Sequence, residues 1–121
     1  MRLVLAEDEP DIQLIARLAL KREGFDVTTA SSGAEALAAV ADCRPDVVLL
    51  DWMMPDLDGL ETCARLKSNP DTQHIPVIFL TAKSQESEIR RGLAVGALGY
   101  ITKPFDALAL GTLVRQLLES R

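Results

Sequence analysis

The stretch that decides the fold is Val47–Gly59, which reads Val-Val-Leu-Leu-Asp-Trp-Met-Met-Pro-Asp-Leu-Asp-Gly. Its first four residues are apolar, and a run of this length predicts a strand that is buried on both faces of a parallel sheet. Asp51 is then expected at the carboxyl end of this strand. The residues from Pro55 to Gly59 are typical of a turn that leads into a helix.

Asp51 is the candidate nucleophile of the chain. Ligands of open α/β sheets bind outside the carboxyl ends of the strands, so a carboxylate at this edge is expected at the rim of a pocket. The alternative interpretation is that Asp51 only caps the turn, because aspartate is common in turns. The residues that end the other strands decide between the two.

The same alternation of a short strand with an amphipathic helix runs through the whole chain. Apolar runs predict four further strands, at residues 3–6, 25–29, 75–80 and 99–102. Helical spacing of apolar residues follows every strand. Strands that alternate with crossover helices form a parallel sheet with helices on both faces. Residues 1–121 are therefore expected to form a single α/β domain, a doubly wound (βα)5 fold.

Capping signals mark two of the helix starts. Ser32 and Glu35 have the spacing of a capping box, which predicts a helix from residue 33. Phe105 and Asp106 are expected to form a hydrophobic staple and an N-cap. The final helix is therefore predicted to begin directly after Asp106 and to include Leu108.

Composition excludes several classes of protein. The chain has 13 Lys and Arg against 18 Asp and Glu, a net charge of −5, and no basic run that could follow a phosphate backbone. Direct nucleic-acid binding by this domain is therefore not expected. No apolar stretch reaches the roughly 18 residues that a membrane span needs, and Cys43 and Cys63 lack the spacing of metal ligands. We expect reduced thiols, no membrane association and a cytoplasmic location.

Polar residues end four of the five predicted strands. Because parallel strands point the same way, these residues share one edge of the sheet; they are Glu7, Asp8, Asp51, Thr81 and Lys103. Unpaired like charges at about 4 Å would repel each other by roughly 1 to 4 kcal/mol. Oxygen ligands without thiolates or imidazoles favour a hard cation such as Mg²⁺. The sequence therefore predicts a magnesium site beside Asp51.

A phosphoryl group is the reactant that fits this combination of groups. A divalent cation beside Asp51 allows the phosphoryl group to approach a carboxylate that would otherwise repel it. Asp51 is then expected to attack phosphorus and to become an aspartyl phosphate. The remaining roles follow from residue type: Asp8 as a direct metal ligand, Glu7 as a ligand through water, the Met53 backbone carbonyl as a further ligand, and Lys103 and the Thr81 hydroxyl as partners of phosphoryl oxygens.

Four features, in this order, resemble the receiver domains of two-component response regulators, and stand-alone chemotaxis-type receivers in particular. They are Glu7-Asp8, Asp51-Trp-Met-Met-Pro-Asp-Leu-Asp-Gly59, Thr81-Ala82 and Lys103-Pro104-Phe105. The resemblance covers the whole chain. It implies a flavodoxin-like fold with a five-stranded parallel sheet in the order 2-1-3-4-5, and a cis Lys103–Pro104 bond.

The resemblance also implies a function. A sensor histidine kinase or a phosphotransfer protein would phosphorylate Asp51, and Thr81 and Tyr100 would then reorient. The surface formed by the last two helices and the fifth strand would thereby switch its affinity for a downstream protein target. Catalysis would be limited to the chain's own phosphoryl transfer and autodephosphorylation. Met53 is apolar and lies two residues after the phosphoacceptor, which suggests an aspartyl phosphate that is not short-lived.

The chain departs from the family pattern at two places. Glu7 stands where the family often has Asp. Leu98-Gly99 stands where receivers of the winged-helix DNA-binding class carry two aspartates, so the ionic dimer of that class is not expected. A stand-alone receiver is therefore favoured over the receiver fragment of a longer DNA-binding regulator. A pseudo-receiver adaptor, which is folded but never phosphorylated, is the other alternative.

Two enzyme or cofactor classes on similar folds fit less well. A flavin-binding electron carrier needs a phosphate-cradling loop after its first strand, and the acidic run Glu7-Asp8-Glu9 would repel the phosphate. A phosphatase with an aspartate nucleophile needs an acid where Met53 stands. Other polar and aromatic residues receive ordinary interpretations: Trp52 as packing, Tyr100 as either packing or a switch, His74 as a loop residue and Lys83 as solvent-facing.

Overall fold

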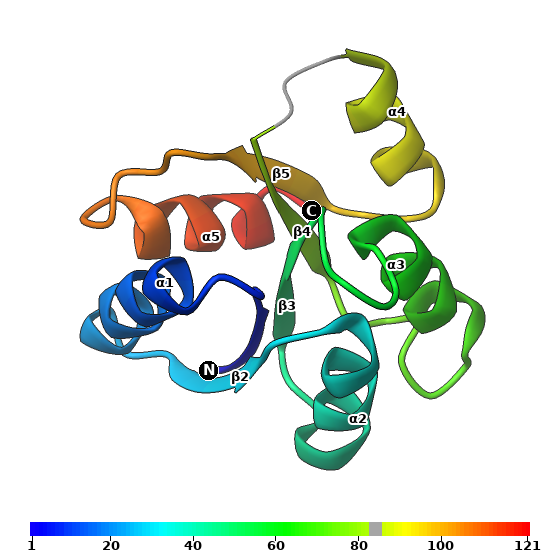
Figure 1. The fold of residues 1–121 in the computed structure, drawn as a ribbon, viewed down its shortest axis with the longest axis horizontal. Helices are drawn as coiled ribbons and strands as arrows, with labels where there is room; N and C mark the ends of the chain where they lie inside the picture. The colour runs from blue at the N-terminus through cyan, green and yellow to red at the C-terminus, as the bar shows by residue number, and fades with distance from the viewer. Residues whose placement is uncertain (83–85) are drawn as a thin grey trace.

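The computed structural model describes residues 1–82 and 86–121, in which strands and helices alternate (Figure 1). The strands are β1 (Arg2–Ala6), β2 (Asp26–Ala30), β3 (Val47–Asp51), β4 (Val77–Thr81) and β5 (Gly99–Thr102). The helices are α1 (Pro10–Arg22), α2 (Gly33–Cys43), α3 (Gly59–Ser68), α4 (Glu86–Ala94) and α5 (Leu110–Glu119). The prediction for Lys83 concerns a residue outside the described ranges.

The five strands form one parallel sheet in the order β2-β1-β3-β4-β5. This order confirms the flavodoxin-like fold. The chain runs outward from β1 to β2, returns across β1, and continues through β3 to β5 on the other side. Crossover connections on opposite sides leave a crevice at the carboxyl ends of β1 and β3, which is where such sheets bind ligands.

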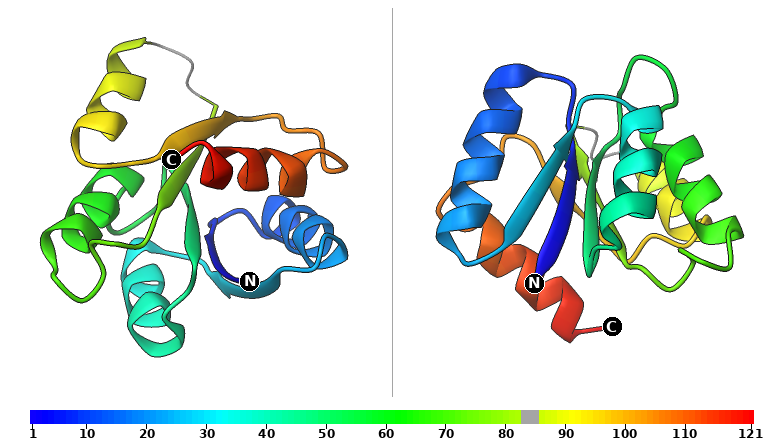
Figure 2. Two further views of the ribbon diagram at one scale, coloured as in Figure 1. Left: turned by 180° about the vertical axis from the view of Figure 1, so that it is seen from behind. Right: turned by 90° about the horizontal axis from the view of Figure 1, so that it is seen from below.

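Helices cover both faces of the sheet. α1 and α5 lie on one face, and α2, α3 and α4 lie on the other (Figures 1 and 2). Two apolar clusters fill the layers between them, one joining the sheet to α1 and α5 and the other joining it to α2 and α3. All residues of β3 and β4 are buried, which confirms the prediction of a strand covered on both sides.

The starts of α2 and β4 refine two predictions. Ser32 caps α2 as predicted, since its side chain accepts a hydrogen bond from the Glu35 N–H. The Glu35 carboxylate accepts from the Ser31 N–H rather than from Ser32, so the capping box is displaced by one residue. β4 begins at Val77, after Pro76 rather than before it, because proline has no N–H for the sheet.

The prediction for the start of the final helix was wrong. α5 begins at Leu110, after Ala109, and Leu108 lies before the helix with 71% of its surface exposed. Asp106 accepts a hydrogen bond from the Leu108 N–H through its side chain, and its carbonyl accepts from the Ala109 N–H. The aspartate therefore closes a turn of its own, which competes with helix formation. Phe105 still packs against the core cluster that contains Leu110.

Three smaller predictions, for the cysteines, for His74 and for the Lys103–Pro104 bond, are also confirmed. Cys43 and Cys63 are free thiols, and Cys63 is buried. His74 is exposed in the turn between α3 and β4. The Lys103–Pro104 peptide bond is cis. Among the described residues, every helix is too short or too polar to cross a bilayer.

Candidate functional site

The sheet itself places the predicted site residues at one edge. Asp51 and Thr81 are the last residues of β3 and β4, and Glu7 and Lys103 follow β1 and β5 directly. Main-chain hydrogen bonds continue one residue past the strands. The Glu7 N–H donates to the Ala30 carbonyl at 3.0 Å and the Lys103 N–H donates to the Thr81 carbonyl at 2.8 Å. The backbone positions of these side chains are therefore set by the register of the sheet.

Lys103 links two carboxylates at this edge. Its Nζ donates to Glu7 Oε1 at 2.5 Å and to Asp51 Oδ1 at 3.1 Å. Glu7 is completely buried and Asp51 is 4% exposed, so both carboxylates depend on the ammonium for charge compensation. The second oxygen of Glu7 accepts the Glu9 N–H at 3.1 Å. The Glu7 carboxylate is thus held by a partner on each oxygen.

Asp8 completes an acidic cluster with Glu7 and Asp51. Each of the three carboxylates has one oxygen that lies within 4.8 Å of the corresponding oxygens of the other two. Asp8 is exposed, whereas the other two are buried, so the cluster opens to solvent on the Asp8 side. Three carboxylates and one ammonium leave two negative charges when all are ionised. Mg²⁺ matches both this charge and the all-oxygen donor set.

The pKa of Asp51 reflects the unbalanced charge. Burial raises this pKa to about 7, together with hydrogen bonding to Glu7 and the negative charge of Glu7, while Lys103 opposes the shift. Burial lowers the pKa of Lys103, but its hydrogen bond with Glu7 and the charges of Asp51 and Glu7 outweigh this effect and raise the pKa. Lys103 is therefore charged at neutral pH, and in the absence of metal a proton on Asp51 relieves part of the repulsion.

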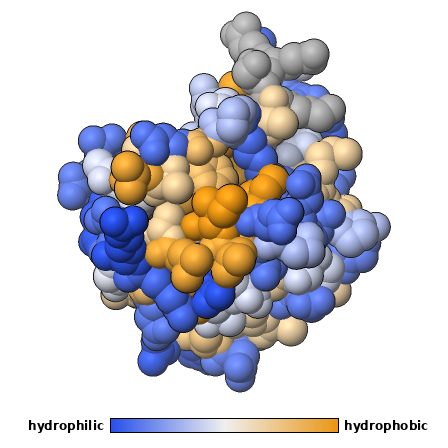
Figure 3. Space-filling view, turned by 60° about the vertical axis from the view of Figure 1, so that its left-hand side comes forward, coloured by the Kyte–Doolittle hydropathy of each residue, from blue (hydrophilic) through white to orange (hydrophobic). Residues whose placement is uncertain are grey.

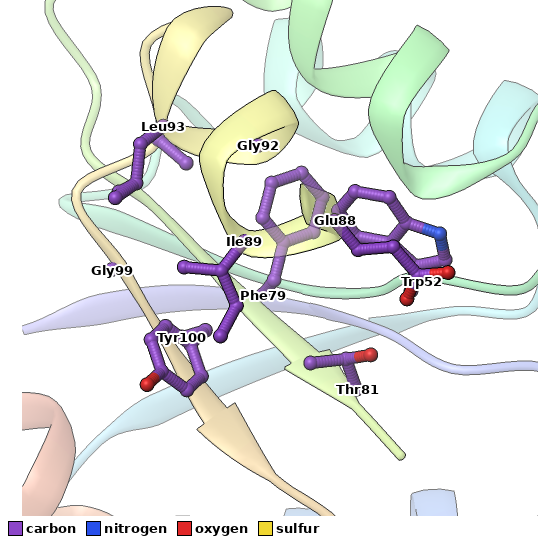
Figure 4. Close-up of a pocket in the computed structure, with 10 residues that line it drawn as sticks. Trp52, Phe79, Thr81, Glu88, Ile89, Gly92, Leu93, Gly99 and Tyr100 are labelled. Atoms are coloured by element: carbon purple, nitrogen blue, oxygen red, sulfur yellow. The ribbon is translucent and has the colours of Figure 1, made fainter. Parts of the chain in front are cut away.

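A small cavity of about 10 Å³ lies under α4, next to this edge of the sheet. Thr81 and Tyr100 line it together with Trp52 and Phe79 (Figure 4). The Trp52 and Phe79 rings pack at 4.9 Å between centroids, which confirms the packing interpretation of Trp52. Thr81 is buried, whereas Tyr100 is 41% exposed and directs its hydroxyl away from the two rings (Figure 4). The cavity holds about one water molecule, so it does not admit the Tyr100 ring as it stands.

Two residues that support the site were missed by sequence reasoning. Gln13 on α1 donates from Nε2 to the carbonyls of Glu7 at 2.8 Å and Ala30 at 3.2 Å, which fixes the connection after β1. The sequence predicts only a turn at Asp56, but its carboxylate accepts hydrogen bonds from the first two N–H groups of α2. Neither role has a local sequence signal, because the partners come from other parts of the chain.

Comparison with known protein families identifies the family of the chain. The family model described as "Response regulator receiver domain" matches residues 3–115. The chain belongs to the response regulator receiver family. Receivers typically bind Mg²⁺ at an acidic pocket, and in this receiver Glu7, Asp8 and Asp51 form an acidic cluster of that kind.

Curated relatives of this receiver include regulators of several kinds. It is 41% identical over 117 residues to the phosphate regulon transcriptional regulatory protein PhoB of Rhizobium meliloti, a match that covers 97% of this chain and 52% of the relative. It is 40% identical over 106 residues to the protein PilG of Pseudomonas aeruginosa, covering 88% of this chain and 78% of the relative. The chain thus spans about half the length of the PhoB relative.

Solved structures confirm the fold of the receiver. The chemotaxis response regulator CheY4 of Vibrio cholerae superposes with a TM-score of 0.90 at 28% identity, covering 96% of this chain and 97% of that one. A putative response regulator from Chloroflexus aurantiacus gives a TM-score of 0.90 at 31% identity, covering 98% and 97%. Both matches extend over nearly the whole receiver.

Proposed function

We propose that this receiver accepts a phosphoryl group on Asp51, in the presence of Mg²⁺, from a sensor histidine kinase or a phosphotransfer protein. The observation that carries the proposal is the position of Lys103, whose ammonium contacts Glu7 and Asp51 at the edge where Asp8 opens the acidic cluster to solvent. One cation, one nucleophile and a set of metal ligands are thereby gathered at the carboxyl ends of the strands.

The transfer step follows from these groups. An Asp51 oxygen forms a bond to phosphorus while the P–N bond to the donor imidazole breaks, and the electron pair of that bond returns to the imidazole. Lys103 moves from Asp51 to a phosphoryl oxygen, and the Thr81 hydroxyl donates to another. Bound Mg²⁺ supplies the positive charge that the carboxylates and the phosphoryl group require together. These reactions, with autodephosphorylation, are the only catalysis that we propose.

The metal ligands proposed are Asp8, Asp51 and the Met53 backbone carbonyl, with Glu7 acting through water. The partners of Glu7 support this division. Because one Glu7 oxygen is bonded to Lys103 and the other to the Glu9 N–H, the carboxylate is less available for direct coordination. Asp8 is exposed and is therefore free to turn toward a metal without losing a buried contact.

The signal is proposed to leave the site through the α4-β5-α5 surface. Phosphorylation adds a charge of about −1.5 to −2 at Asp51, and a move of the Thr81 hydroxyl toward this charge would open space beside Tyr100. The Tyr100 ring would then turn inward, and the surface around β5 would change its affinity for a downstream protein. The location of Thr81 and Tyr100 on the same cavity supports this coupling (Figure 4).

The phosphodonor protein is proposed to dock on the side of the molecule that carries α1, within the cytoplasm. Leu14, Ile15 and Leu18 of α1 are exposed, and Leu108 lines the same groove as Ile15 and Leu18. A second groove joins Ile15 to Lys103. Figure 3 shows apolar side chains gathered on this side of the molecule. A helical protein seated on this face would bring its histidine close to Asp51.

A second candidate function is favoured by the lengths of the relatives. Because the PhoB relative is about twice as long as the matched region, this receiver is also a candidate for the regulatory part of a longer transcriptional regulator. The phosphoacceptor chemistry is the same in both cases. The difference lies in whether the switched surface contacts a separate protein or a domain of the same chain.

Acetyl phosphate tests the proposed function directly. The receiver is incubated with acetyl phosphate and Mg²⁺, and the products are examined by intact mass spectrometry. One added phosphoryl group is expected in the wild type, and none in Asp51→Ala or after removal of Mg²⁺ with EDTA. If the wild type gained no phosphoryl group, or if Asp51→Ala gained as much as the wild type, the pseudo-receiver adaptor would be favoured instead.

A further inference from the structure

The connection between β3 and α3, residues 52–58, is attached to a helix that precedes it in the chain. Asp56 Oδ1 accepts the Gly33 N–H at 2.8 Å and Asp56 Oδ2 accepts the Ala34 N–H at 2.9 Å. Gly33 and Ala34 are the first two residues of α2. The N–H of the third residue, Glu35, donates to the Ser32 hydroxyl oxygen. Asp56 thus caps two otherwise unpaired donors of another element with both of its oxygens.

The fit between α2 and the connection is close at the same point. A Cβ on Gly33 would lie 2.7 Å from the Leu57 carbonyl oxygen and 2.6 Å from Thr62 Oγ1, so only glycine allows this approach. Hydrogen bonds from the Ala34, Leu57 and Gly33 amides lower the pKa of Asp56, so the carboxylate is ionised at neutral pH and complements the helix N-terminus.

The attachment restricts the backbone beside the nucleophile. At its base, the connection is closed by the Gly59 N–H, which donates to the Trp52 carbonyl at 2.8 Å. Asp56 holds its far side, and Pro55 stiffens the link because its ring fixes one backbone torsion. Met53 lies between these two fixed points, and its N–H donates to Asp51 Oδ1 at 3.4 Å.

We propose that Asp56 is a positioning residue for the magnesium site, which it serves by tying the β3–α3 connection to α2 and so holding the Met53 carbonyl beside Asp51. The inference rests on the proposed function, because it takes the Met53 carbonyl as a metal ligand. Residues that orient metal ligands without touching the metal change metal affinity by about 10- to 100-fold when they are replaced.

Titration with Mg²⁺ alone tests the role of Asp56. Trp52 adjoins Asp51, so its fluorescence reports binding without any phosphoryl donor. Asp56→Ala is expected to raise the dissociation constant for Mg²⁺ by about tenfold or more. Asp56→Asn keeps one acceptor oxygen and is expected to fall between Asp56→Ala and the wild type. Thermal unfolding of each variant is followed in parallel.

Ser32→Ala is the matched control, because it removes a cap from the same end of α2 but leaves the β3–α3 connection untouched. It is expected to lower thermal stability as Asp56→Ala does, with a change in the dissociation constant of less than about twofold. Equal dissociation constants in Asp56→Ala and the wild type would overturn the inference, as would an equal increase in Ser32→Ala. If the wild type binds Mg²⁺ and is phosphorylated by acetyl phosphate, the proposed function stands even when the role of Asp56 is overturned. If the wild type does neither, the proposed function and the role of Asp56 are both overturned.

Discussion

At the scale of single residues, the site is a balance of buried charges. Glu7 and Asp51 share the ammonium of Lys103, and both carboxylates are buried, so solvent screens their charges only weakly. Such an arrangement is costly to fold, since moving charges out of water is only partly offset by pairing. The proposed function accounts for this cost, because the same groups would take up a metal and a phosphoryl group.

Asp51→Asn is expected to change how the stability of the metal-free protein depends on pH. The pKa of Asp51 is raised to about 7 in the folded protein, mainly by burial, and an unfolded aspartate titrates near its ordinary pKa of about 3.9. Between these two values the folded state binds more protons than the unfolded state. The free energy of unfolding of the wild type therefore falls as the pH rises through this window, by at most about 1.4 kcal/mol per pH unit.

Asparagine cannot titrate, so Asp51→Asn lacks this contribution. Urea unfolding in EDTA at several values between about pH 4 and pH 8 measures the difference. The stability of Asp51→Asn relative to the wild type should increase with pH across this range. Parallel pH profiles for the two proteins would contradict the assigned environment of Asp51.

Lys103→Met is expected to destabilise the protein more at high pH than at low pH. Without the ammonium, two buried carboxylates face each other, and removing one partner of a buried pair costs about 3–5 kcal/mol. At about pH 5 Asp51 is protonated, because its pKa is raised to about 7, so the repulsion and its cost should be smaller. Urea unfolding in EDTA at about pH 8 and about pH 5 measures both differences.

Lys67→Met is the control for Lys103→Met. Lys67 is also partly buried, but its Nζ donates to the carbonyls of Gln73 at 3.1 Å and Ile75 at 2.6 Å rather than to carboxylates. Its replacement should cost nearly the same at both pH values. If Lys103→Met showed the same pH-independent loss, the repulsion between Glu7 and Asp51 would be smaller than the geometry indicates.

At the scale of elements, α4 is held against the sheet through a glycine. Gly92 faces the Trp52 and Phe79 rings, and a Cβ there would lie 2.9 Å from Phe79 Cε2 and 3.3 Å from Trp52 Cζ3 (Figure 4). Trp52, one of the two rings, directly follows Asp51 in the chain. The position of α4 is therefore sensitive to the space beside β3, the strand that ends at Asp51.

Gly92→Ala tests this packing. In an unobstructed helix, alanine in place of glycine stabilises by about 0.5–1 kcal/mol. Here the added methyl group should press α4 away from the rings, lower the free energy of unfolding and shift the emission of Trp52. Ser87→Ala, on an exposed position of α4, is the control and should leave the emission unchanged. If Gly92→Ala instead raised the free energy of unfolding by the full amount of about 0.5–1 kcal/mol, α4 would be able to shift and accommodate the methyl group without cost.

At the scale of the whole molecule, the metal should stabilise the fold. The proposed ligands come from the ends of β1 and β3, which are brought together only in the folded sheet. A ligand that binds the folded state alone stabilises it by about 2.7 kcal/mol at a concentration of 100 times its dissociation constant. Thermal unfolding in increasing Mg²⁺ is expected to show a rising midpoint in the wild type.

Asp8→Asn is the comparison for the effect of Mg²⁺, because Asp8 is exposed and its loss should not disturb the core. This variant should show little rise in the midpoint at the same Mg²⁺ concentrations. An equal rise in the wild type and in Asp8→Asn would indicate that Mg²⁺ acts on the protein surface in general.

Much of this molecule could be predicted from sequence because the decisive signals are local. Apolar runs such as Val47–Leu50 predict buried strands, and alternation with helices predicts a parallel sheet. The direction of parallel strands then predicts that Glu7, Asp51 and Lys103 meet at one edge, which the ion pairs confirm. The start of α5 was misjudged, because Asp106 forms a turn of its own where a helix cap was expected.

The sequence by itself determined the class of fold and the chemical types of residue at the carboxyl edge of the sheet. Only the tertiary structure decided which donor meets which acceptor: that Lys103 bridges Glu7 and Asp51, that Gln13 holds the carbonyl after β1, and that Asp56 caps α2. The physical reason is that patterns of apolar residues act over a few neighbouring positions. The hydrogen bonds and ion pairs of the site join segments that are distant in the chain and become neighbours only after the sheet has formed.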